Sequence, residues 1–408
     1  MTTANHFAST NRVQLSYIQE LSYKSVPVAG NGVNLRLTGE TLDFNLTKQS
    51  DKEIRSDRQL SSTTTVGAAG SGDIKVHMQY AEYDPFFQAL LQDSYSVFGT
   101  NGVSATATVD FTATTMTASV ATSGSSNWAN LKKGQWFLLR TGGANDKKLL
   151  RVSSITAPTS TVITLDAGTP ATVASAVPSC TVATSRVKNG VTLNTFVLEK
   201  AMNDIGQYIT YVGCAVSKFS VNFASGSLSE GTFSFLMSGA TNQATTLLPG
   251  TPVASRTFDI QNGVTGVAQI WEGGAPLTST SIKSMSLEVD NALRGQEAIG
   301  TLGYVGIGVG TFSVKGSLEV YFADGALYQK FLTDQYTSIV LSTQDTQGNG
   351  YVITLPRVNL TGGKIQAGSK DADMMASFNY ECYGDMANAD STLRYTMFID
   401  RVGVAVIP

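Results

Sequence analysis

The sequence predicts a mostly β protein with two tandem β-sandwich or barrel domains, each carrying a short helix, and a small inserted β domain. Three observations support this fold class. Short segments alternate between apolar and polar residues, which is the period of half-buried strands. A group of these segments recurs in the same order, and a stretch rich in Thr, Ala, Ser and Gly interrupts only the first group. At 408 residues the chain is long enough for two or three domains of ~150 residues each.

The predicted strands follow the alternation. In residues 41–47 three apolar side chains share one face, namely Leu42, Phe44 and Leu46. The same pattern occurs in residues 73–80 and 232–238. We therefore expect each strand to bury one face and to present polar side chains on the other.

One helix is predicted over residues 84–93. Asp84 is a suitable N-cap, because its carboxylate can accept from the free backbone N–H groups of the first turn. Pro85 suits the first helical position, where no backbone N–H is needed.

An internal repeat organises the chain. Four pairs of segments align in the same order: 42–46 with 285–289, 72–80 with 316–322, 87–95 with 328–336, and 231–239 with 376–384. After its interruption the first copy resumes at residues 191–198, which align with residues 351–355. Collinear matches of this kind indicate a duplicated domain.

Domain boundaries follow from the repeat. The first domain is expected at residues 1–98 and 188–248, the inserted domain at 99–187, a linker at 249–280 and the second domain at 281–408. Because the insert interrupts a loop, it should fold separately, and a short linker should be able to replace it.

Composition excludes several classes of function. Charged residues make up 14% of the chain and the net charge is -3, so no basic field is available to hold a phosphate backbone tightly. Cys180, Cys214 and Cys382 are odd in number and far apart, which argues against a disulfide framework and a zinc site. No apolar stretch of ~18 residues is present, so we expect no membrane span.

Catalytic motifs are also missing from the sequence. The only histidines are His6 and His77, and no nucleophile elbow, phosphate loop or metal-binding spacing occurs. The glycine-rich residues 303–310 lead into a strand rather than opening a helix, so they do not fit a nucleotide site. We expect no enzymatic activity, no cofactor and no metal.

Each copy has a long polar segment between its first two strands, at residues 48–70 and 291–310. Loops of this length inside compact domains are usually functional. Their mixed charges fit a solvated loop or salt bridges between subunits. The charged residues proposed for these contacts are Glu53, Arg55, Asp57, Arg58, Arg294 and Glu297.

The strand alternation also defines polar sheet faces. The charged residues and the histidine on them are Asp43, Asp73, Lys75, His77, Glu288, Asp290, Glu319 and Glu381. A duplicated β module with polar faces and docking loops favours ring assembly, because closing the sheets into a barrel removes their exposed edges.

Several motifs resemble the tail tube proteins of long-tailed bacteriophages. In the first copy these are LTGETLDF at residues 37–44, SDKEIRSDRQ at 50–59, GSGDI at 70–74 and YDPFF at 83–87. The second copy adds similar residues at 290–291, 316, 321–328 and 355–356. The resemblance covers both copies but not the insert.

This resemblance implies a structural virion protein that polymerises as stacked rings around a lumen for genome ejection. A ring of six tube domains implies a trimer of this duplicated chain with pseudo-sixfold symmetry. The eight polar-face residues would then line the lumen as a net-negative wall, with the insert outside. The implied partners are the chain itself and the tape measure, tail terminator and distal tail proteins, while DNA passes without tight binding. The implied location is the virion tail, assembled in the host cytoplasm.

Two other classes remain open. A β-rich virion decoration protein or host-binding adhesin would share this composition, but it would not need a tandem duplication with paired docking loops. A glycan-processing β enzyme would need paired carboxylates in a cleft.

Overall fold

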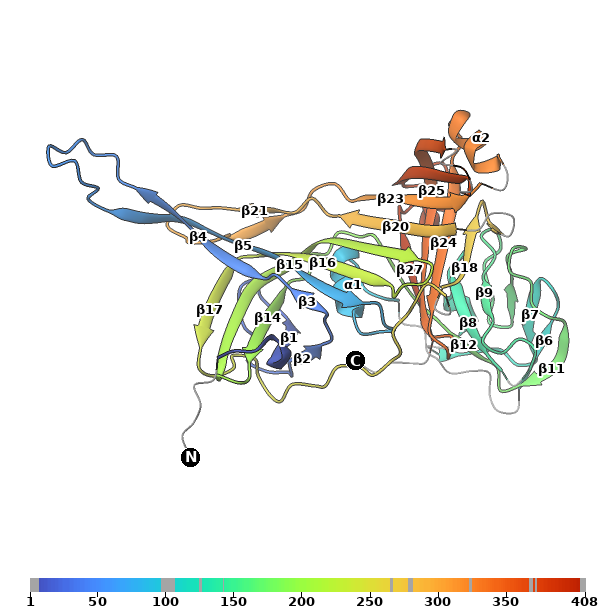
Figure 1. Cartoon of the computed structure of the whole chain (residues 1–408). Coiled ribbons are helices and arrows are strands. Elements are labelled where there is room, and N and C mark those ends of the chain that lie inside the picture. The colour runs from blue at the N-terminus through green and yellow to red at the C-terminus, as the bar shows by residue number, and fades with distance from the viewer. Residues whose placement is uncertain are drawn as a thin grey trace.

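The computed structural model describes residues 7–96, 107–124, 127–141, 143–264, 267–277, 282–322, 325–366, 370 and 373–403. His6 therefore lies outside the described residues. Strands dominate the described part, which contains two α-helices, so the predicted mostly β class is confirmed. Figure 1 shows a long body with a thin β arm at one end and the inserted strands at the other.

The first copy of the repeat contains, in chain order, β1 (Val13–Gln19), β2 (Val33–Leu35), β3 (Gly39–Glu40), β4 (Asp43–Ser50), β5 (Thr63–His77), α1 (Asp84–Leu91), β14 (Phe196–Met202), β15 (Gln207–Ala224), β16 (Glu230–Met237) and β17 (Gly239–Gln243). The second copy contains β18 (Val267–Glu272), β19 (Ala275–Pro276), β20 (Ile282–Asp290), β21 (Arg294–Gln296), β22 (Gly306–Gly308), β23 (Ser313–Tyr321), α2 (Ala326–Leu332), β24 (Thr337–Gln344), β25 (Gly350–Gln366), β26 (Met375–Tyr383) and β27 (Phe398–Val402).

The two copies have the same strand order. In the first copy, hydrogen bonds join β4 to β5, β5 to β16, β16 to β15, β15 to β14, and β14 to β1. The second copy repeats this order with β20, β23, β26, β25, β24 and β18. β17 and β27 add to the N-terminal halves of β15 and β25. All pairs are antiparallel, so the duplication includes the topology as well as the sequence.

This topology corrects two of the sequence alignments. In the second copy, Leu287 lies opposite Gly316. In the first copy, Leu42 lies beside the equivalent Gly72, because a Cβ added to Gly72 would be 2.5 Å from the Cα of Leu42. Leu42 is therefore equivalent to Leu287 rather than to Met285. The strand that follows the insert, β14, corresponds to β24 and not to residues 351–355. Alternation alone fixes a strand only to within two residues, because every second residue faces the same way.

The predicted linker at 249–280 is also wrong in part. β18 lies within this range, pairs with β24 and turns into β19, just as β1 pairs with β14 and with β2. The second copy therefore begins before the predicted residue 281. Its first strand lies outside the aligned segments, so the repeat does not reveal it.

β15 and β25 each belong to two layers of strands. The N-terminal half of each strand pairs with β14 or β24, in what we call the outer layer. The C-terminal half pairs with β16 or β26, in what we call the inner layer. A register shift marks the change at Val216–Lys218 in β15, and an equivalent one lies at Leu360–Gly362 in β25. Such bulges bend a strand and increase its twist, which lets one strand serve both layers.

The main core lies between these layers and contains α1. Phe86 and Phe87 of α1 are buried against Phe233 of β16, with ring centroids 5.5 and 5.4 Å apart. The predicted helix is present, but Asp84 is not its cap, because the capping position falls on Tyr83 and lacks a side-chain cap bond. The Asp84 carboxylate instead accepts from Tyr351 at 2.7 Å and pairs with Arg401 at 2.5 Å.

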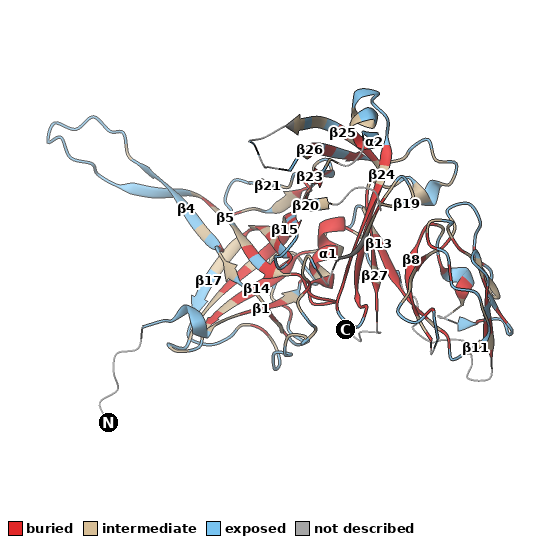
Figure 2. Cartoon of the chain, turned by 45° about the vertical axis from the view of Figure 1, so that its right-hand side comes forward, coloured by how far each residue is buried: buried red, intermediate tan, exposed pale blue. Residues whose placement is uncertain are grey.

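The insert comprises β6 (Thr108–Phe111), β7 (Thr115–Ala118), β8 (Trp136–Arg140), β9 (Leu149–Arg151), β10 (Val162–Thr164), β11 (Ala174–Pro178) and β12 (Thr181–Ala183). These strands surround a hydrophobic cluster drawn from residues 107–182, distinct from the main core. The predicted boundary at residue 187 is wrong, because β13 (Ser185–Lys188) pairs with β27 of the second copy. Figure 2 shows the insert beside the strands of the second copy, with buried residues inside each unit.

Candidate assembly surfaces

One continuous inner sheet runs through both copies. Its strands follow the order β4, β5, β16, β15, β20, β23, β26 and β25, with β15 and β20 joining the copies. On one face its apolar side chains are buried in the core, and on the other polar side chains alternate with them. The sheet therefore presents a single polar face that extends across the whole chain.

All eight predicted polar-face residues lie on this surface. Asp43, Asp73 and Asp290 line one hollow of about 670 Å³, while Glu288 and Glu381 line another of about 630 Å³. The remaining three belong to the same face by register, because Lys75 and His77 lie opposite Thr232 and Glu230, and Glu319 lies opposite Ser284 and Ser377.

Lysines on the same face neutralise part of its negative charge. The Nζ atoms of three lysines pair with carboxylates: Lys218 with Asp290 at 2.8 Å, Lys315 with Glu288 at 3.3 Å, and Lys283 with Glu319 at 3.4 Å. Burial opposes ionisation of Asp290, but hydrogen bonds from Lys218 and from the Ala292 N–H hold its pKa below the ordinary value.

The face is less acidic than the sequence analysis predicts. Lys283, Lys315 and Lys364 were missed there, although Lys315 lies four residues before the predicted polar-face residue Glu319. Lys364 lies opposite Ser377 and therefore shares the same face. Glu230 adds one further carboxylate opposite His77. The described part of the face thus has a small acidic excess, with seven carboxylates against five lysines: Asp43, Asp73, Glu230, Glu288, Asp290, Glu319 and Glu381 against Lys75, Lys218, Lys283, Lys315 and Lys364.

The junction between the copies is tightly bonded. Lys218–Ala224 of β15 pair with Ser284–Asp290 of β20, so the two sheets share a full edge. Beyond this edge, the buried Asn291 side chain donates to the carbonyl oxygens of Leu90 and Val216 at 2.8 and 3.3 Å. The second copy therefore contacts both α1 and β15 of the first.

The polar segment predicted as a loop at residues 48–70 is mostly a β-hairpin arm. β4 and β5 stay paired as far as Ser50 and Thr63, well beyond the body (Figure 1), and Figure 2 shows the arm almost wholly exposed. Two apolar side chains near its tip are exposed to solvent: Ile54 has an exposed fraction of 103% and Leu60 one of 76%.

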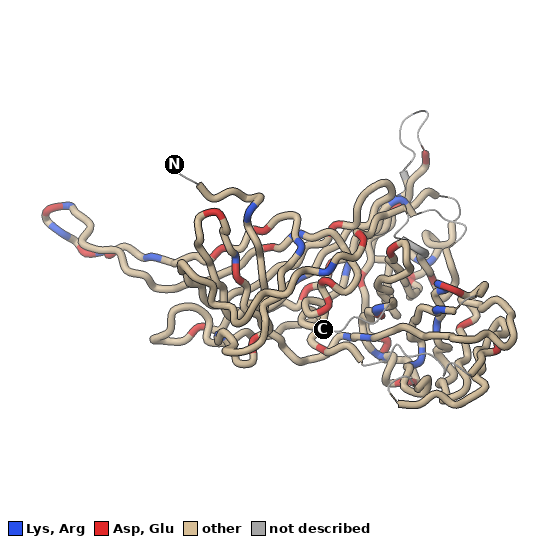
Figure 3. The backbone as a smooth tube through the Cα atoms, turned by 90° about the horizontal axis from the view of Figure 1, so that it is seen from below, with Lys and Arg blue, Asp and Glu red and all other residues tan. Residues whose placement is uncertain are grey.

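Among the described residues, the charged tip of this arm contacts only its own neighbours along the chain. Arg55 pairs with Asp57 at 2.7 Å, and this hydrogen bond lowers the pKa of Asp57. Glu53 accepts from Ser61 at 3.3 Å, while Arg58 is exposed in the left-handed region with φ 58°. Figure 3 shows charged residues gathered at the tip of the arm, away from the body.

The second polar segment also contains a hairpin, formed by β21 and β22. Arg294 and Glu297 are exposed there. This hairpin lies against the first copy, because Lys24 donates to the carbonyl oxygen of Tyr304 at 3.2 Å and an added Cβ on Gly303 would lie 2.4 Å from the Ser238 oxygen. The hairpin of one copy thus rests on the other copy.

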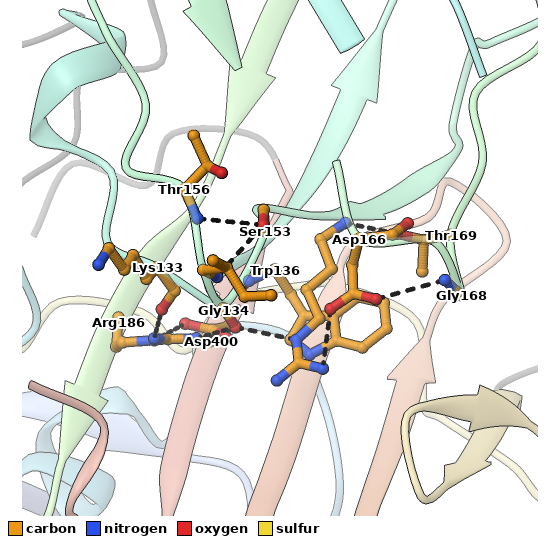
Figure 4. Close-up of polar contacts among 12 residues, drawn as sticks. Lys133, Gly134, Trp136, Ser153, Thr156, Asp166, Gly168, Thr169, Arg186 and Asp400 are labelled. Carbon is orange, nitrogen blue, oxygen red and sulfur yellow. Dashed lines mark hydrogen bonds and ion pairs between the residues drawn. The ribbon is translucent and has the colours of Figure 1, made fainter. Parts of the chain in front are cut away.

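The insert is anchored on a buried ion pair between β13 and β27, because Arg186 of that pair also donates to the carbonyl oxygen of Gly134 at 2.7 Å. Asp400 of β27 is fully buried, and its two oxygens each lie 2.7 Å from nitrogens of Arg186 (Figure 4). Asp400 also accepts from the Trp136 N–H at 3.1 Å, and the Trp136 ring packs on Trp271 with centroids 4.5 Å apart. No local sequence pattern joins Arg186 to Asp400, so sequence reasoning missed this contact.

The described residues contain little that resembles a reactive centre. All three cysteines are free and buried, and burial raises the pKa of Cys180 to about 12, which makes it a poor nucleophile. No group of three or more His, Cys, Asp or Glu side chains in the described part is placed to hold a metal ion. Neither described helix has the length and hydropathy needed to cross a bilayer.

The chain is a duplicated β fold with one continuous polar sheet face, a projecting hairpin and two sheet edges. This architecture is typical of a β-structured protein that assembles with further copies or partners. A family model described as phage tail tube protein matches residues 10–382, and the chain belongs to this family. The match extends over both copies and the insert, and it confirms the resemblance carried by the motifs. The family is a structural component of the phage tail. A search of curated proteins gave no significant match.

Proposed function

We propose that three copies of this chain close into a ring and that stacked rings form the tail tube through which the genome is ejected. The observation that carries this proposal is the in-chain junction, where β15 and β20 join two duplicated sheets edge to edge. Three chains joined in the same way would supply six equivalent units and give pseudo-sixfold symmetry.

The free edges of the inner sheet support ring closure. At one end β4 pairs only with β5, and at the other the C-terminal half of β25 pairs only with β26 among the described residues. Long unpaired edges promote association with other strands, and closure into a barrel removes them.

The difference between the helices supports the same arrangement. α1 buries six of its residues, including Asp84, which bonds to the second copy, whereas α2 buries only Leu327. In a ring, the first copy of the next chain would cover α2 as the second copy covers α1.

The polar face is assigned to the lumen, because the opposite face is occupied by the core. The eight predicted residues Asp43, Asp73, Lys75, His77, Glu288, Asp290, Glu319 and Glu381 would then line the bore. Its carboxylates and lysines nearly balance, and such a wall lacks the array of unpaired cations that binds DNA tightly by counterion release.

The insert would face outward. Trp136 and Leu138 of the insert pack on Trp271, Val340 and Val352 of the outer layer, on the side away from the inner sheet. The charged arm tip would contact the next ring or the neighbouring chain. The ends of the tube would meet the tail terminator, tape measure and distal tail proteins, with assembly in the host cytoplasm.

Cryo-electron microscopy of the purified protein, combined with native mass spectrometry, tests this proposal. We expect hollow rings or rods with three chains per ring. Six whole chains per ring, or single particles decorating another structure, would contradict it.

A further inference from the structure

We propose that the edge between chains repeats the register of the in-chain junction, so that residues 362–365 of β25 pair antiparallel with residues 42–45 of a second copy. This register places Lys364 directly opposite Asp43 of that second copy. The inference rests on the proposed ring and specifies which residues of its subunits meet.

The equivalent residues on the first edge follow from the shared bulge. In β15, Lys218 resumes regular pairing after the bulge, and Ser220 then lies opposite Thr232. In β25, Gly362 resumes pairing at the equivalent point, and Lys364 lies opposite Ser377. Lys364 therefore takes the place of Ser220.

The equivalent residues on the second edge follow from Gly72 and Gly316. Each lies where the neighbouring strand approaches too closely for a Cβ, which would be 2.5 Å from Leu42 Cα and 2.1 Å from the Ser286 oxygen. With Leu42 equivalent to Leu287, Asp43 takes the place of Glu288.

The in-chain pairs can then be transferred to the chain–chain edge. Ser220 lies opposite Glu288 within the chain, so Lys364 would lie opposite Asp43 between chains. The side chains of Lys364 and Asp43 are exposed, and neither forms an ion pair with another described residue. Directly opposite residues of unlike charge stabilise an antiparallel pair.

Side-chain size supports the same register on the apolar face. Within the chain the large Phe219 lies opposite the smaller Val289, and both are fully buried. Between chains the equivalent pair is Gly363 opposite Phe44, so the large residue changes strand, and the Phe44 ring would meet the Phe331 ring that covers Gly363. A one-residue slip would turn Phe44 outward, so burial of the apolar face helps to specify the register.

Disulfide trapping tests the register. The double variant Lys364→Cys/Asp43→Cys should form disulfides between chains in assembled tubes, because directly opposite Cβ atoms in antiparallel strands are ~4.5–5.5 Å apart. Lys364→Cys/Asn45→Cys is the matched control, since these residues are diagonal neighbours ~7–8 Å apart, with a Cβ–Cβ distance somewhat shorter but beyond that of a directly opposite pair. The native cysteines are buried and should not interfere.

We expect a covalent ladder for the first variant and at least several-fold less cross-linking for the second. Ser220→Cys/Glu288→Cys should form a disulfide within the chain under the same oxidation, which calibrates the reaction. If tubes form and this calibrating disulfide appears, equal or stronger cross-linking through position 45 would overturn the register but leave the tube function intact. Failure of the wild-type chain to form rings or tubes would instead contradict the proposed function.

A charge exchange gives a second measurement that needs no oxidation. Lys364→Asp and Asp43→Lys should each lower the fraction of protein in rings several-fold, and the combined variant should restore it. An equal or larger loss in the combined variant would overturn the pairing. Thermal unfolding of the dissociated chain should be unchanged, because both side chains are exposed there.

Discussion

A buried ion pair between β13 and β27 anchors the insert to the second copy, through hydrogen bonds to Gly134 and Trp136. Asp400 has no exposed surface, and Arg186 supplies both of its charged hydrogen bonds. Changing Arg186 to Met should therefore destabilise the fold by about 3–5 kcal/mol, because an uncompensated carboxylate remains buried. Urea unfolding should show this loss, while Arg55→Met, which breaks a solvent-exposed pair, should leave the urea midpoint nearly unchanged. Equal effects of the two variants would contradict this account.

Asp290 gives the junction between the copies a pH dependence. Its folded-state pKa lies below the ordinary 3.8, so the folded chain binds fewer protons than the unfolded chain near that pH. Its stabilising contribution is complete above pH 3.8 and is lost as the pH falls through the lower, folded-state pKa. The difference in urea midpoint between the wild type and Asp290→Asn should therefore be larger at neutral pH than near pH ~3. A difference in urea midpoint that does not change with pH would contradict the predicted direction of this pH dependence.

Among the structural elements, the arm formed by β4 and β5 is the clearest candidate for a contact with another chain. Its tip exposes Ile54 and Leu60 beside six charged residues. Changing Arg55 and Arg58 to Glu should shorten or weaken the tubes, because the contacts of the tip would lose two of its three cationic groups. Lys132→Glu/Lys147→Glu, an equal charge change at exposed positions in the insert, should leave tube length unchanged in electron micrographs. Normal tubes from the arm variant would exclude the tip from assembly.

The insert can be tested as an element once its boundary is corrected. Replacing residues 100–188 with a linker would remove β13 and Arg186 and leave Asp400 without its partner. Replacing only residues 107–182 keeps both, and tubes should still form, although exposed Trp271 and Val340 should lower solubility. We expect the longer deletion to unfold at a lower urea concentration than the shorter one. Loss of rings in the shorter deletion, with the tube domains folded, would make the insert an assembly element.

For the whole molecule, the proposed bore can be altered without breaking an ion pair. Glu288 and Glu319 are paired with lysines, whereas the Glu381 carboxylate accepts only from Tyr383 at 2.8 Å among its described contacts. Glu381→Lys should therefore assemble normally but slow DNA ejection, because each ring gains cations that attract phosphate. Glu381→Gln is the control, and its effect should be smaller. Single-virion ejection assays measure the rate, and an unchanged rate in both variants would argue that this face does not contact DNA.

Local patterns in the sequence were sufficient to predict the β class, the duplication and the polar faces. Alternation identifies which residues share a face, and a collinear repeat needs no spatial information to be recognised. The family motifs were likewise contiguous. These features depend on neighbours along the chain, so they can be read before the chain is folded.

Only the tertiary structure decided the features that join distant residues. The register that makes Leu42 equivalent to Leu287 depends on where two strands meet, and alternation repeats every two residues. β18 became the first strand of the second copy only when its pairing with β24 was seen. The Arg186–Asp400 pair spans 214 positions, and neither residue has a local pattern that names the other. The in-chain junction between β15 and β20, from which the chain–chain register is inferred, exists only because folding brings those two edges together.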